Sequence, residues 1–418
     1  MTMAAAGSGF SASAWSERRS FVHRASLAFV WLATASGCVV VTEPAPWDAL
    51  TLGLLILLPT VGLISIRPLL TLMLFLMMIA GAGALIGVII AKDQPPAAIH
   101  TGVSVFLYIA AFLYAAFIAK RPAVHARLIV QASLEGALLA GLCGFIGYFN
   151  LVPGAADLMT RYSRATGLFK DPNVYGPFLV MGFVYAFHIL LTKPFFKAML
   201  GAAAFAFLSL GLLLSFSRGA WTNAGIALLV YGMFYVINVG SNRARLKFLG
   251  TLVFGVVALG VMLAIALQID EVANLLQQRA ALTQGYDEGP DGRFGGQQKA
   301  MRLIVDNPLG IGAQVFPYFY HHEEAHQVYL SMFMNAGWVG GIAFAVLMFG
   351  SVFLGFFHGL KKVPSQAYFA IGYGTLVGHV AEGFLIDLDH WRHLYVALAV
   401  VWGLMAASAR AEAEGAER

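Results

Sequence analysis

The run LLTLMLFLMMIAGAGALIGVIIA at residues 69–91 contains no charged residue, and it decides what kind of fold this chain can adopt. As an α-helix it would be about 34 Å long, which is enough to cross a hydrocarbon core of about 30 Å. The whole chain agrees, since 59% of its 418 residues are hydrophobic and only 11% are charged. Soluble domains carry about 25% charged residues. The sequence therefore predicts an integral membrane protein rather than a soluble domain.

Similar apolar runs predict an all-α fold with about twelve transmembrane helices. They form one transmembrane domain at 25–418, which follows a cytoplasmic tail at 1–24. Short basic connections such as KRPAVHAR and HGLKK place both termini in the cytoplasm, because Lys and Arg accumulate in short inside loops. The net charge of +5 thus reflects topology, and we expect no nucleic-acid partner. The predicted spans are 25–42, 47–65, 69–91, 99–119, 127–149, 174–192, 196–215, 219–240, 247–269, 327–357, 365–385 and 393–409.

Two of the predicted outside connections are long, at residues 150–173 and at 270–326 between the ninth and tenth helices. A structureless loop as long as the second would be unusual, and loops of that size tend to be functional. Its sequence predicts a short helix at about 297–305, ended by an Asn-Pro pair and followed by bends at Gly310 and Gly312. No internal repeat is evident, which disfavours an inverted-repeat transporter.

Arginines lie where the hydropathy places the outer membrane edge. Arg218 falls in a tight turn, SFSRGAW, with hydroxyl groups around it and no acidic neighbour in the sequence. Arg161 and Arg164 fall in the stretch RYSRATGLFK of the first long loop. A guanidinium holds phosphate oxygens bidentately and keeps its charge, so these positions indicate an anion site. The alternatives are an arginine that reaches the lipid headgroups and a solvated basic loop.

The stretch HHEEAHQ at residues 321–327 directly precedes the tenth predicted span. His326 lies where that span leaves the outer interface, and histidine titrates near pH 6.5, so it is the candidate general base. His322 is one helical turn away, a spacing that two zinc ligands can share. No third helix-spaced histidine and no HExxH order are present, so we expect no metal site. A solvated histidine is the remaining alternative.

Further polar residues could bind the acceptor of a reaction at this edge. The stretch HVAEGFLIDLDHWRH at residues 379–393 places acidic side chains at the outer end of the eleventh span. They could face the same cavity as His326, or they could simply cap an interfacial helix end. The secondary candidates are Arg161, His322, Gln327, Glu382 and Asp389.

Four motifs together resemble those of O-antigen ligases and bacterial O-oligosaccharyltransferases. The first is His326 followed by Gln327, nine residues and then GWVG, with Gly337 and Gly340 as its glycines. The others are RATGLFKDPNVYG with its Arg-x-x-Gly, the turn SFSRGAW, and GRFGGQQKAMRLIVDNPLGIG, which contains Arg293. The resemblance covers about residues 150–345.

This resemblance implies a metal-independent glycosyltransferase of the C-type architecture that uses no cofactor. Such an enzyme moves a glycan from undecaprenyl diphosphate to an acceptor hydroxyl at the periplasmic face of the bacterial inner membrane. Arg164, Arg218 and Arg293 would bind the diphosphate, and His326 would activate the acceptor. The expected partners are the lipid-linked glycan, an acceptor glycolipid (lipid A core) or growing polysaccharide, and the bilayer. A polymerase and a protein transferase of the same family stay open, while a secondary transporter and a scaffold are less favoured.

Overall fold

The computed structural model describes residues 12–268, 289, 291–363 and 365–416. In this part of the chain the protein is helical except for one two-stranded sheet, in agreement with the all-α prediction. The elements of the first half are α1 (Ala12–Ala35), η1 (Ser36–Cys38), α2 (Pro46–Thr60), α3 (Pro68–Ile90), α4 (Gln94–Lys120), α5 (Pro122–Tyr148), α6 (Ala155–Met159), β1 (Thr160–Arg161) and β2 (Arg164–Ala165). Those that follow are α7 (Pro172–Thr192), α8 (Phe195–Leu214), α9 (Arg218–Asn238), α10 (Asn242–Ala266), α12 (Arg293–Asp306), α13 (Val315–Phe319), α14 (Val328–Gly359), α15 (Gln366–Glu382) and α16 (Arg392–Ala416).

Each of the twelve predicted spans overlaps one of these helices. Within the described residues, seven helices are long and apolar enough to cross a membrane: α3, α4, α5, α7, α8, α9 and α14. The 15 residues of α2 would reach only about 22 Å, which is less than a hydrocarbon core. The protein is thus a multi-pass all-α membrane protein, and the total of about twelve spans stays a prediction. The helix α1 begins at Ala12, so part of the tail expected at 1–24 is helical.

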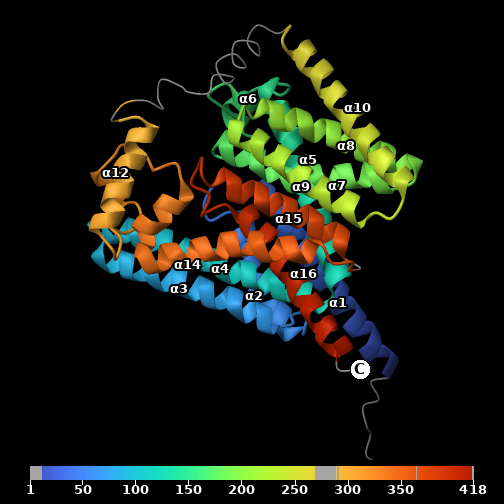
Figure 1. Cartoon of the computed structure of the whole chain (residues 1–418), viewed down its shortest axis with the longest axis horizontal. Coiled ribbons are helices and arrows are strands. Elements are labelled where there is room, and N and C mark those ends of the chain that lie inside the picture. The colour runs from blue at the N-terminus through green and yellow to red at the C-terminus, as the bar shows by residue number, and fades with distance from the viewer. Residues whose placement is uncertain (1–11, 269–288, 290, 364, 417–418) are drawn as a thin grey trace, which may run out of the picture.

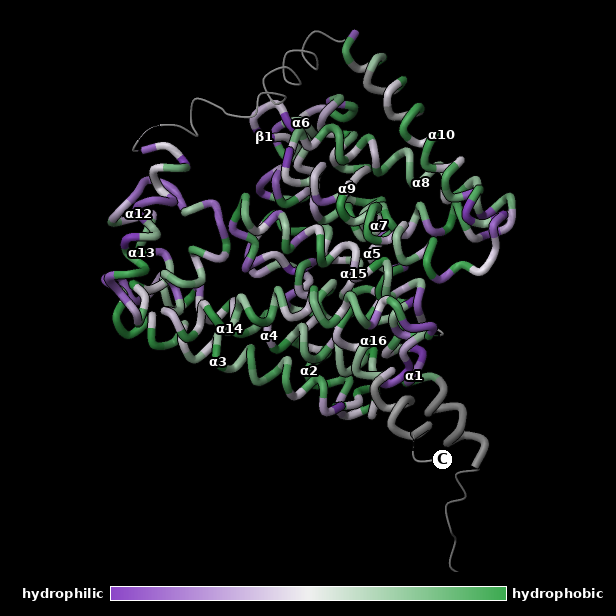
Figure 2. The backbone as a smooth tube through the Cα atoms, in the orientation of Figure 1, coloured by the Kyte–Doolittle hydropathy of each residue, from purple (hydrophilic) through white to green (hydrophobic). Residues whose placement is uncertain are grey.

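The long helices lie side by side, and their packing places the loops at two ends. Helix α3 packs along α14 and α4, and α16 packs along α4. On the other side of the bundle α15 packs along α9, and α7 packs along α8 and α5 (Figure 1). Helices α12 and α13 lie at the left-hand end of Figure 1, and we call this the α12 end. Hydrophilic residues are concentrated at the α12 end and at the turns on the opposite side (Figure 2).

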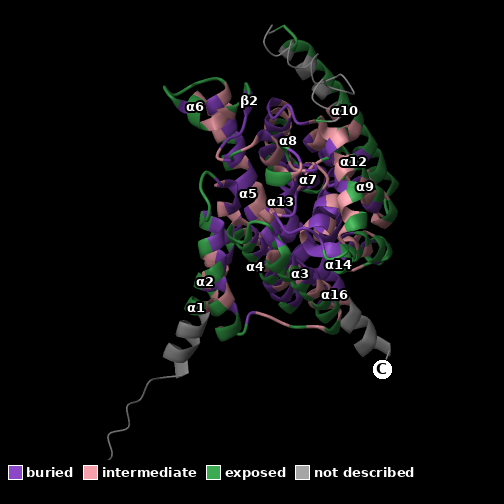
Figure 3. Cartoon of the chain, turned by 90° about the vertical axis from the view of Figure 1, so that its left-hand side faces the viewer, coloured by how far each residue is buried: buried purple, intermediate pink, exposed green. Residues whose placement is uncertain are grey.

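The buried residues gather between these helices, while the outer faces of the helices are exposed (Figure 3). This distribution suits a bundle that meets lipid on its outside. Helix α7 is the most enclosed of the seven, with 83% of its apolar window buried, and α8 the least, with 28%. Helix α8 therefore lies at the periphery of the bundle, whereas α7 lies between α5, α8 and α9.

The glycines that follow His326 allow close backbone contacts. Gly337 has φ +66° and bends α14, and its amide neighbour Trp338 donates a hydrogen bond to the carbonyl oxygen of Pro308 at 2.8 Å. Gly340 faces Gly83 of α3, where an added Cβ would lie only 2.9 Å from the Cα of Gly340. The loop after α12 thus packs on the bend, and α3 packs directly on α14.

The short helix expected in the second long connection is present and begins earlier than predicted. It runs from Arg293 to Asp306 as α12, and Asn307 follows its last turn. Gly310 and Gly312 have φ values of +85° and +90°, a backbone conformation that glycine adopts without strain. Residues 270–288 and 290 of this connection lie outside the described residues.

Candidate functional site

Arg164 lies on a small β-hairpin that holds it against the turn before α9. The strands β1 and β2 pair in antiparallel register, and the two residues between them, Tyr162 and Ser163, both have φ of +55°. Positive φ at both central positions is typical of a two-residue hairpin turn. The Arg164 side chain is buried, and its Nε donates to the carbonyl oxygen of Ser215 at 2.7 Å. The hairpin therefore positions this cation against Ser215, which precedes Arg218 by three residues.

The start of α7 holds the other side of the same guanidinium. Nη2 of Arg164 donates to Oδ1 of Asn173 at 2.7 Å. Asp171 caps α7 by accepting a hydrogen bond from the Asn173 amide at 2.7 Å, as the Asp-Pro-Asn sequence predicts. The two motifs quoted around Arg164 and Arg218 thus meet in space, although 51 positions separate Arg164 from Ser215.

Arg218 is the first residue of α9, directly after its cap. Ser217 caps the helix, with its Oγ accepting from the amide of Ala220 at 3.3 Å. Phe216 before it has φ of +45°, which makes the turn tight. A helix N-terminus carries partial positive charge and exposes amide groups, both of which favour a bound anion. Arg218 therefore adds a full cation to a place that already favours negative charge.

The carboxylate of Glu382 packs directly on the first turn of α9. A Cβ added at Gly219 would lie 2.6 Å from Oε1 of Glu382. The other oxygen accepts a hydrogen bond from Nδ2 of Asn223 at 2.7 Å, and the same Nδ2 lies 2.6 Å from Nδ1 of His379. Glu382 is 2% exposed. It therefore faces α9 rather than an open surface, which suits a residue that holds the Arg218 turn better than one that binds an acceptor.

His326 lies just before α14, in contact with the start of α12. Its φ is +50°, and Gln327 is the cap residue of α14. Arg293, the first residue of α12, donates from Nη2 to the carbonyl oxygen of His326 at 3.4 Å and also to that of Leu385. The imidazole is 36% exposed, and its Nε2 lies 3.1 Å from Oε2 of Glu323. His326 is thus accessible and has a carboxylate partner on one ring nitrogen.

An acidic cluster lies beside His326. Burial, reinforced by the charges of Asp387 and Asp389, raises the pKa of Glu324 to about 8. Burial also raises the pKa of Asp387 to about 6, although a hydrogen bond from Ser331 and the proximity of His326 oppose the shift. The Ser331 hydroxyl donates to Oδ1 of Asp387 at 2.5 Å. The raised pKa values favour a protonated carboxyl group in this cluster, beside the histidine.

Sequence reasoning did not single out Glu324 and Asp387 as site residues. Asp387 belongs to the acidic stretch that the sequence analysis placed in a possible common cavity with His326, but the pairing of Asp387 with Glu324 was not predicted. The available signals were the position of this stretch at the outer end of the eleventh predicted span and its number of acidic residues in a chain that is poor in charge. Their proximity depends on the packing of α14 against α15.

The segment from 382 to 387 joins the two groups of residues. Glu382 contacts the Arg218 turn through Gly219, as described above. The carbonyl oxygen of Gly383 accepts the amide of Val328 at 3.0 Å, and that of Leu385 accepts from Arg293. The short segment from the last residue of α15 onward therefore contacts the start of α9, the start of α12 and the start of α14. The three helix starts that carry Arg218, Arg293 and His326 meet at this segment.

The secondary candidates occupy different environments. Arg161 is exposed, donates to the carbonyl oxygen of Lys170 at 3.0 Å and covers the ring of Tyr162. His322 is exposed and lies against the ring of His321, with 4.5 Å between the ring centroids. His321 itself is buried and packs on Phe316. None of the described contacts of Arg161 or His322 involves the Arg293–His326 pair.

One set of side chains in the described residues could hold a metal ion, and the sequence did not predict it. His100, Asp389 and His390 place one ligand atom each within 4.8 Å of one another. The Asp389 carboxylate lies 3.6 Å from Nε2 of His100 and 4.0 Å from Nε2 of His390. Two imidazoles and a carboxylate are suitable zinc ligands, at separations somewhat wider than a bound zinc requires. The histidines expected as the alternative metal set, His322 and His326, do not form part of it.

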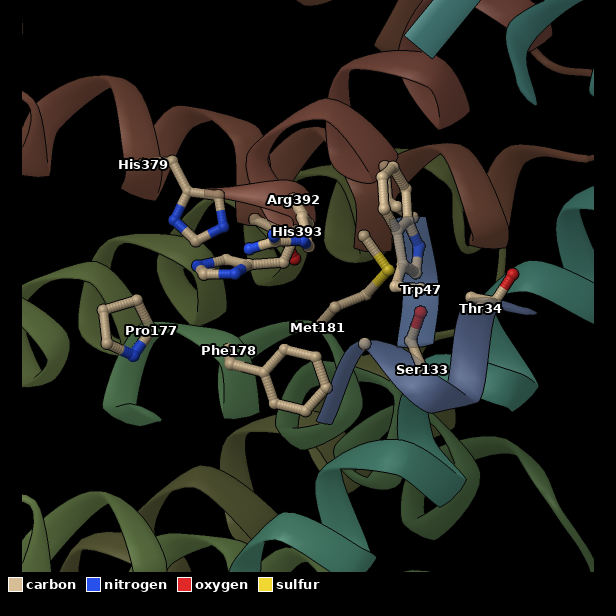
Figure 4. A pocket seen from close by; sticks show the side chains of 12 residues that line it. Thr34, Trp47, Ser133, Pro177, Phe178, Met181, His379, Arg392 and His393 are labelled. Atoms are coloured by element: carbon tan, nitrogen blue, oxygen red, sulfur yellow. The ribbon is translucent and has the colours of Figure 1, made fainter. Parts of the chain in front are cut away.

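A small internal cavity lies deeper in the bundle. Figure 4 shows His379 and His393 with their rings close together, next to Arg392, Trp47 and Phe178. The two rings are 5.0 Å apart between centroids, and Arg392 forms a two-pronged ion pair with Asp48 at 2.8 and 2.6 Å. None of the predicted site residues lines this cavity. It therefore lies behind the candidate site, to which His379 connects it through Asn223.

Residues 203–345 match the family model described as O-antigen ligase. The matched range runs from α8 to α14 and includes Arg218, Arg293 and His326, with the loop and glycines between them. No curated protein matches the chain. The resemblance stated from the four motifs is therefore confirmed over this range, while Arg164 and Glu382 lie outside it.

Proposed function

We propose that this chain, which carries an O-antigen ligase family region, transfers a glycan from undecaprenyl diphosphate to an acceptor hydroxyl of the lipid A core. The reaction takes place at the periplasmic face of the inner membrane, which is the α12 end of the bundle. The observation that carries the proposal is the contact of Arg293 with the backbone of His326. This contact supports the proposal because the residue assigned to the donor and the residue assigned to the acceptor are then neighbours, both within the matched range.

The donor half of the reaction needs fixed cations. When the bond between the sugar and the diphosphate breaks, the leaving diphosphate gains negative charge. Preorganised arginines stabilise such charge without having to reorganise during the step. Arg164 is held by Ser215 and Asn173, and Arg218 opens α9, so both cations sit on rigid elements. Arg293 is the third, at the start of α12.

The acceptor half needs a base. The acceptor oxygen attacks the anomeric carbon, the bond from that carbon to the diphosphate oxygen breaks, and His326 takes the hydroxyl proton. Glu323 lies 3.1 Å from Nε2 and orients the ring. This leaves Nδ1 as the nitrogen that accepts the proton. A positioned base typically contributes about 10²–10⁴ in rate.

The proposed transfer uses no metal, because the three arginines supply the positive charge that a metal would otherwise supply. Purified enzyme should therefore keep its transfer rate in excess EDTA. A loss of activity that zinc restores would overturn this part of the proposal, and His100, Asp389 and His390 would then be the first ligands to replace.

The decisive experiment uses a bacterial mutant that lacks the surface polysaccharide ligase. Expression of this chain should restore long glycan chains attached to lipid A. If it instead lengthens single repeat units in a polymerase mutant, the acceptor is a growing polysaccharide, and if glycan appears on protein, the acceptor is a protein hydroxyl. In vitro, the probe is purified undecaprenyl-diphosphate glycan with lipid A core as acceptor. Absence of transfer to every acceptor, from a protein that is folded and inserted, would contradict the proposed function.

A further inference from the structure

At the end of the bundle away from α12, helices α5, α7 and α8 enclose a groove with a volume of about 650 Å³. Helix α7 starts beside Arg164 and extends for 21 residues, so its far end lies about 30 Å from that site. The residues that line the groove are Arg127, Gln131, Leu134, Leu138, Tyr185, Ile189, Lys193, Lys197, Leu200, Gly201, Ala203, Ala204 and Phe207. None of them belongs to the candidate site.

The mouth of the groove is basic. Arg127 lies in the second turn of α5, Lys193 directly follows α7, and Lys197 lies in the first turn of α8. In the part of the chain that the structure describes, no carboxylate lies within 4.0 Å of any of these three cations. The nearby Glu135 accepts a hydrogen bond from the indole of Trp31 on α1, and it does not line the groove. The mouth thus carries a local excess of positive charge.

The interior of the groove is mostly apolar. Leucine, isoleucine and phenylalanine side chains line its walls, and the small side chains of Ala203 and Ala204 leave space along α8. From Arg127 to Leu138, α5 advances 11 residues, or about 16 Å. This is about half of a 30 Å hydrocarbon core. The groove therefore has the depth of one leaflet, with its charges at the headgroup level.

We propose that this groove holds one anionic phospholipid of the leaflet that faces the basic loops. The phosphate lies between Arg127, Lys193 and Lys197, and one acyl chain lies along Leu138 and Phe207. Basic pockets between membrane helices on the cytoplasmic side are suited to anionic headgroups. The low burial of α8 agrees with a lipid that completes the packing between α8 and α5.

The test measures lipid retention by the full chain purified in detergent. Dioleoyl-phosphatidylglycerol and dioleoyl-phosphatidylcholine are titrated separately, and the bound lipid is counted by native mass spectrometry. One phosphatidylglycerol should be retained at a concentration at least tenfold lower than phosphatidylcholine. The triple variant R127Q/K193Q/K197Q should lose this preference. The matched control R243Q/R245Q removes two exposed cations from the start of α10, outside the groove, and should keep it.

A second pair of variants tests the acyl-chain channel without altering charge. Ala204→Trp fills the groove, whereas Ala206→Trp adds the same side chain at an exposed position that does not line it. Ala204→Trp should retain at least tenfold less phosphatidylglycerol, and Ala206→Trp should behave as wild type. Equal retention of both lipids by wild type would overturn the proposal, and so would an unchanged preference in the triple variant. Equal lipid retention by the two tryptophan variants would also overturn the proposal. Glycan transfer is not measured in any arm, so the result is independent of the proposed reaction.

Discussion

Arg293 donates a hydrogen bond to the backbone carbonyl oxygen of His326 at 3.4 Å, so the first residue of α12 contacts the residue on which acceptor activation is proposed to depend. The same guanidinium also bonds the carbonyl of Leu385, at the end of the segment that follows α15. Arg293 therefore has two roles that can be separated, as a cation near the donor and as a support for the backbone around the histidine.

Replacing Arg293 tests both roles. Arg293→Ala should lower transfer by about 10²–10³, the cost of removing one preorganised donor. Arg293→Lys keeps the charge, but an ammonium cannot bind two phosphate oxygens with a planar fork, so this variant should recover only part of the activity. Transfer from undecaprenyl-diphosphate glycan is the measurement. Arg302→Ala, an exposed arginine on the same helix, is the control and should keep full activity. Wild-type rates for Arg293→Ala would remove Arg293 from the site.

His326→Ala should lower kcat by about 10²–10⁴, because general-base assistance of that size is lost. Binding of the lipid-linked donor should stay within twofold, since the arginines remain. Single-turnover transfer and donor binding, measured on the same preparation, separate the two effects. His23→Ala on α1 serves as the control for loss of a histidine elsewhere. If donor binding is lost together with transfer, His326 contributes to donor binding rather than to acceptor activation.

Arg218→Ala should weaken donor binding and lower transfer by at least about 10². Arg218→Lys should be only partly active, because an ammonium cannot bind two phosphate oxygens in a fixed geometry. The readouts are donor affinity and transfer rate. Lys170→Ala, which removes an exposed cation paired with Glu43 at 3.4 Å, should change neither. Unchanged donor affinity in Arg218→Ala would rule out its assignment to the diphosphate.

Glu382→Ala should destabilise the protein by about 1–3 kcal/mol, because it leaves the buried Nδ2 of Asn223 without this carboxylate acceptor. Thermal unfolding in detergent measures the effect. Glu43→Ala, a surface residue in an exposed ion pair, should change stability little. If Glu382→Ala is as stable as wild type but no longer uses the acceptor, Glu382 binds the acceptor, as the sequence first suggested.

The acidic cluster predicts a pH-dependent stability. Since the pKa of Glu324 is raised to about 8, the folded protein keeps this proton more tightly than the unfolded chain does. Its contribution is therefore complete below the ordinary glutamate pKa and is lost as the pH rises through about 8. Glu324→Gln, which stays neutral, should lose several degrees less thermal stability between pH 5 and pH 8. Parallel unfolding curves for both proteins across this range would contradict the prediction.

Much of the architecture could be predicted from the sequence because membrane helices follow a local rule. A helix that crosses the bilayer must make all of its backbone hydrogen bonds within its own segment. This requirement depends only on residues that are close in the sequence. The helix α12 and its glycine bends were predictable for a similar reason, since Asn-Pro and glycine act on their own segment. The residues Arg218, Arg293 and His326 were found through motifs, and the match at residues 203–345 includes all three.

The sequence by itself determined the class of protein and the approximate positions of its helices, and it supplied the residues that are proposed to carry the chemistry. Only the tertiary structure decided which of them meet. Arg164 reaches Ser215, Glu382 packs on Gly219, and Glu324 lies beside Asp387. These contacts join segments tens of positions or more apart, and the packing of whole helices determines them. In that packing, small residues such as Gly83 and Gly340 permit an approach that no local pattern encodes.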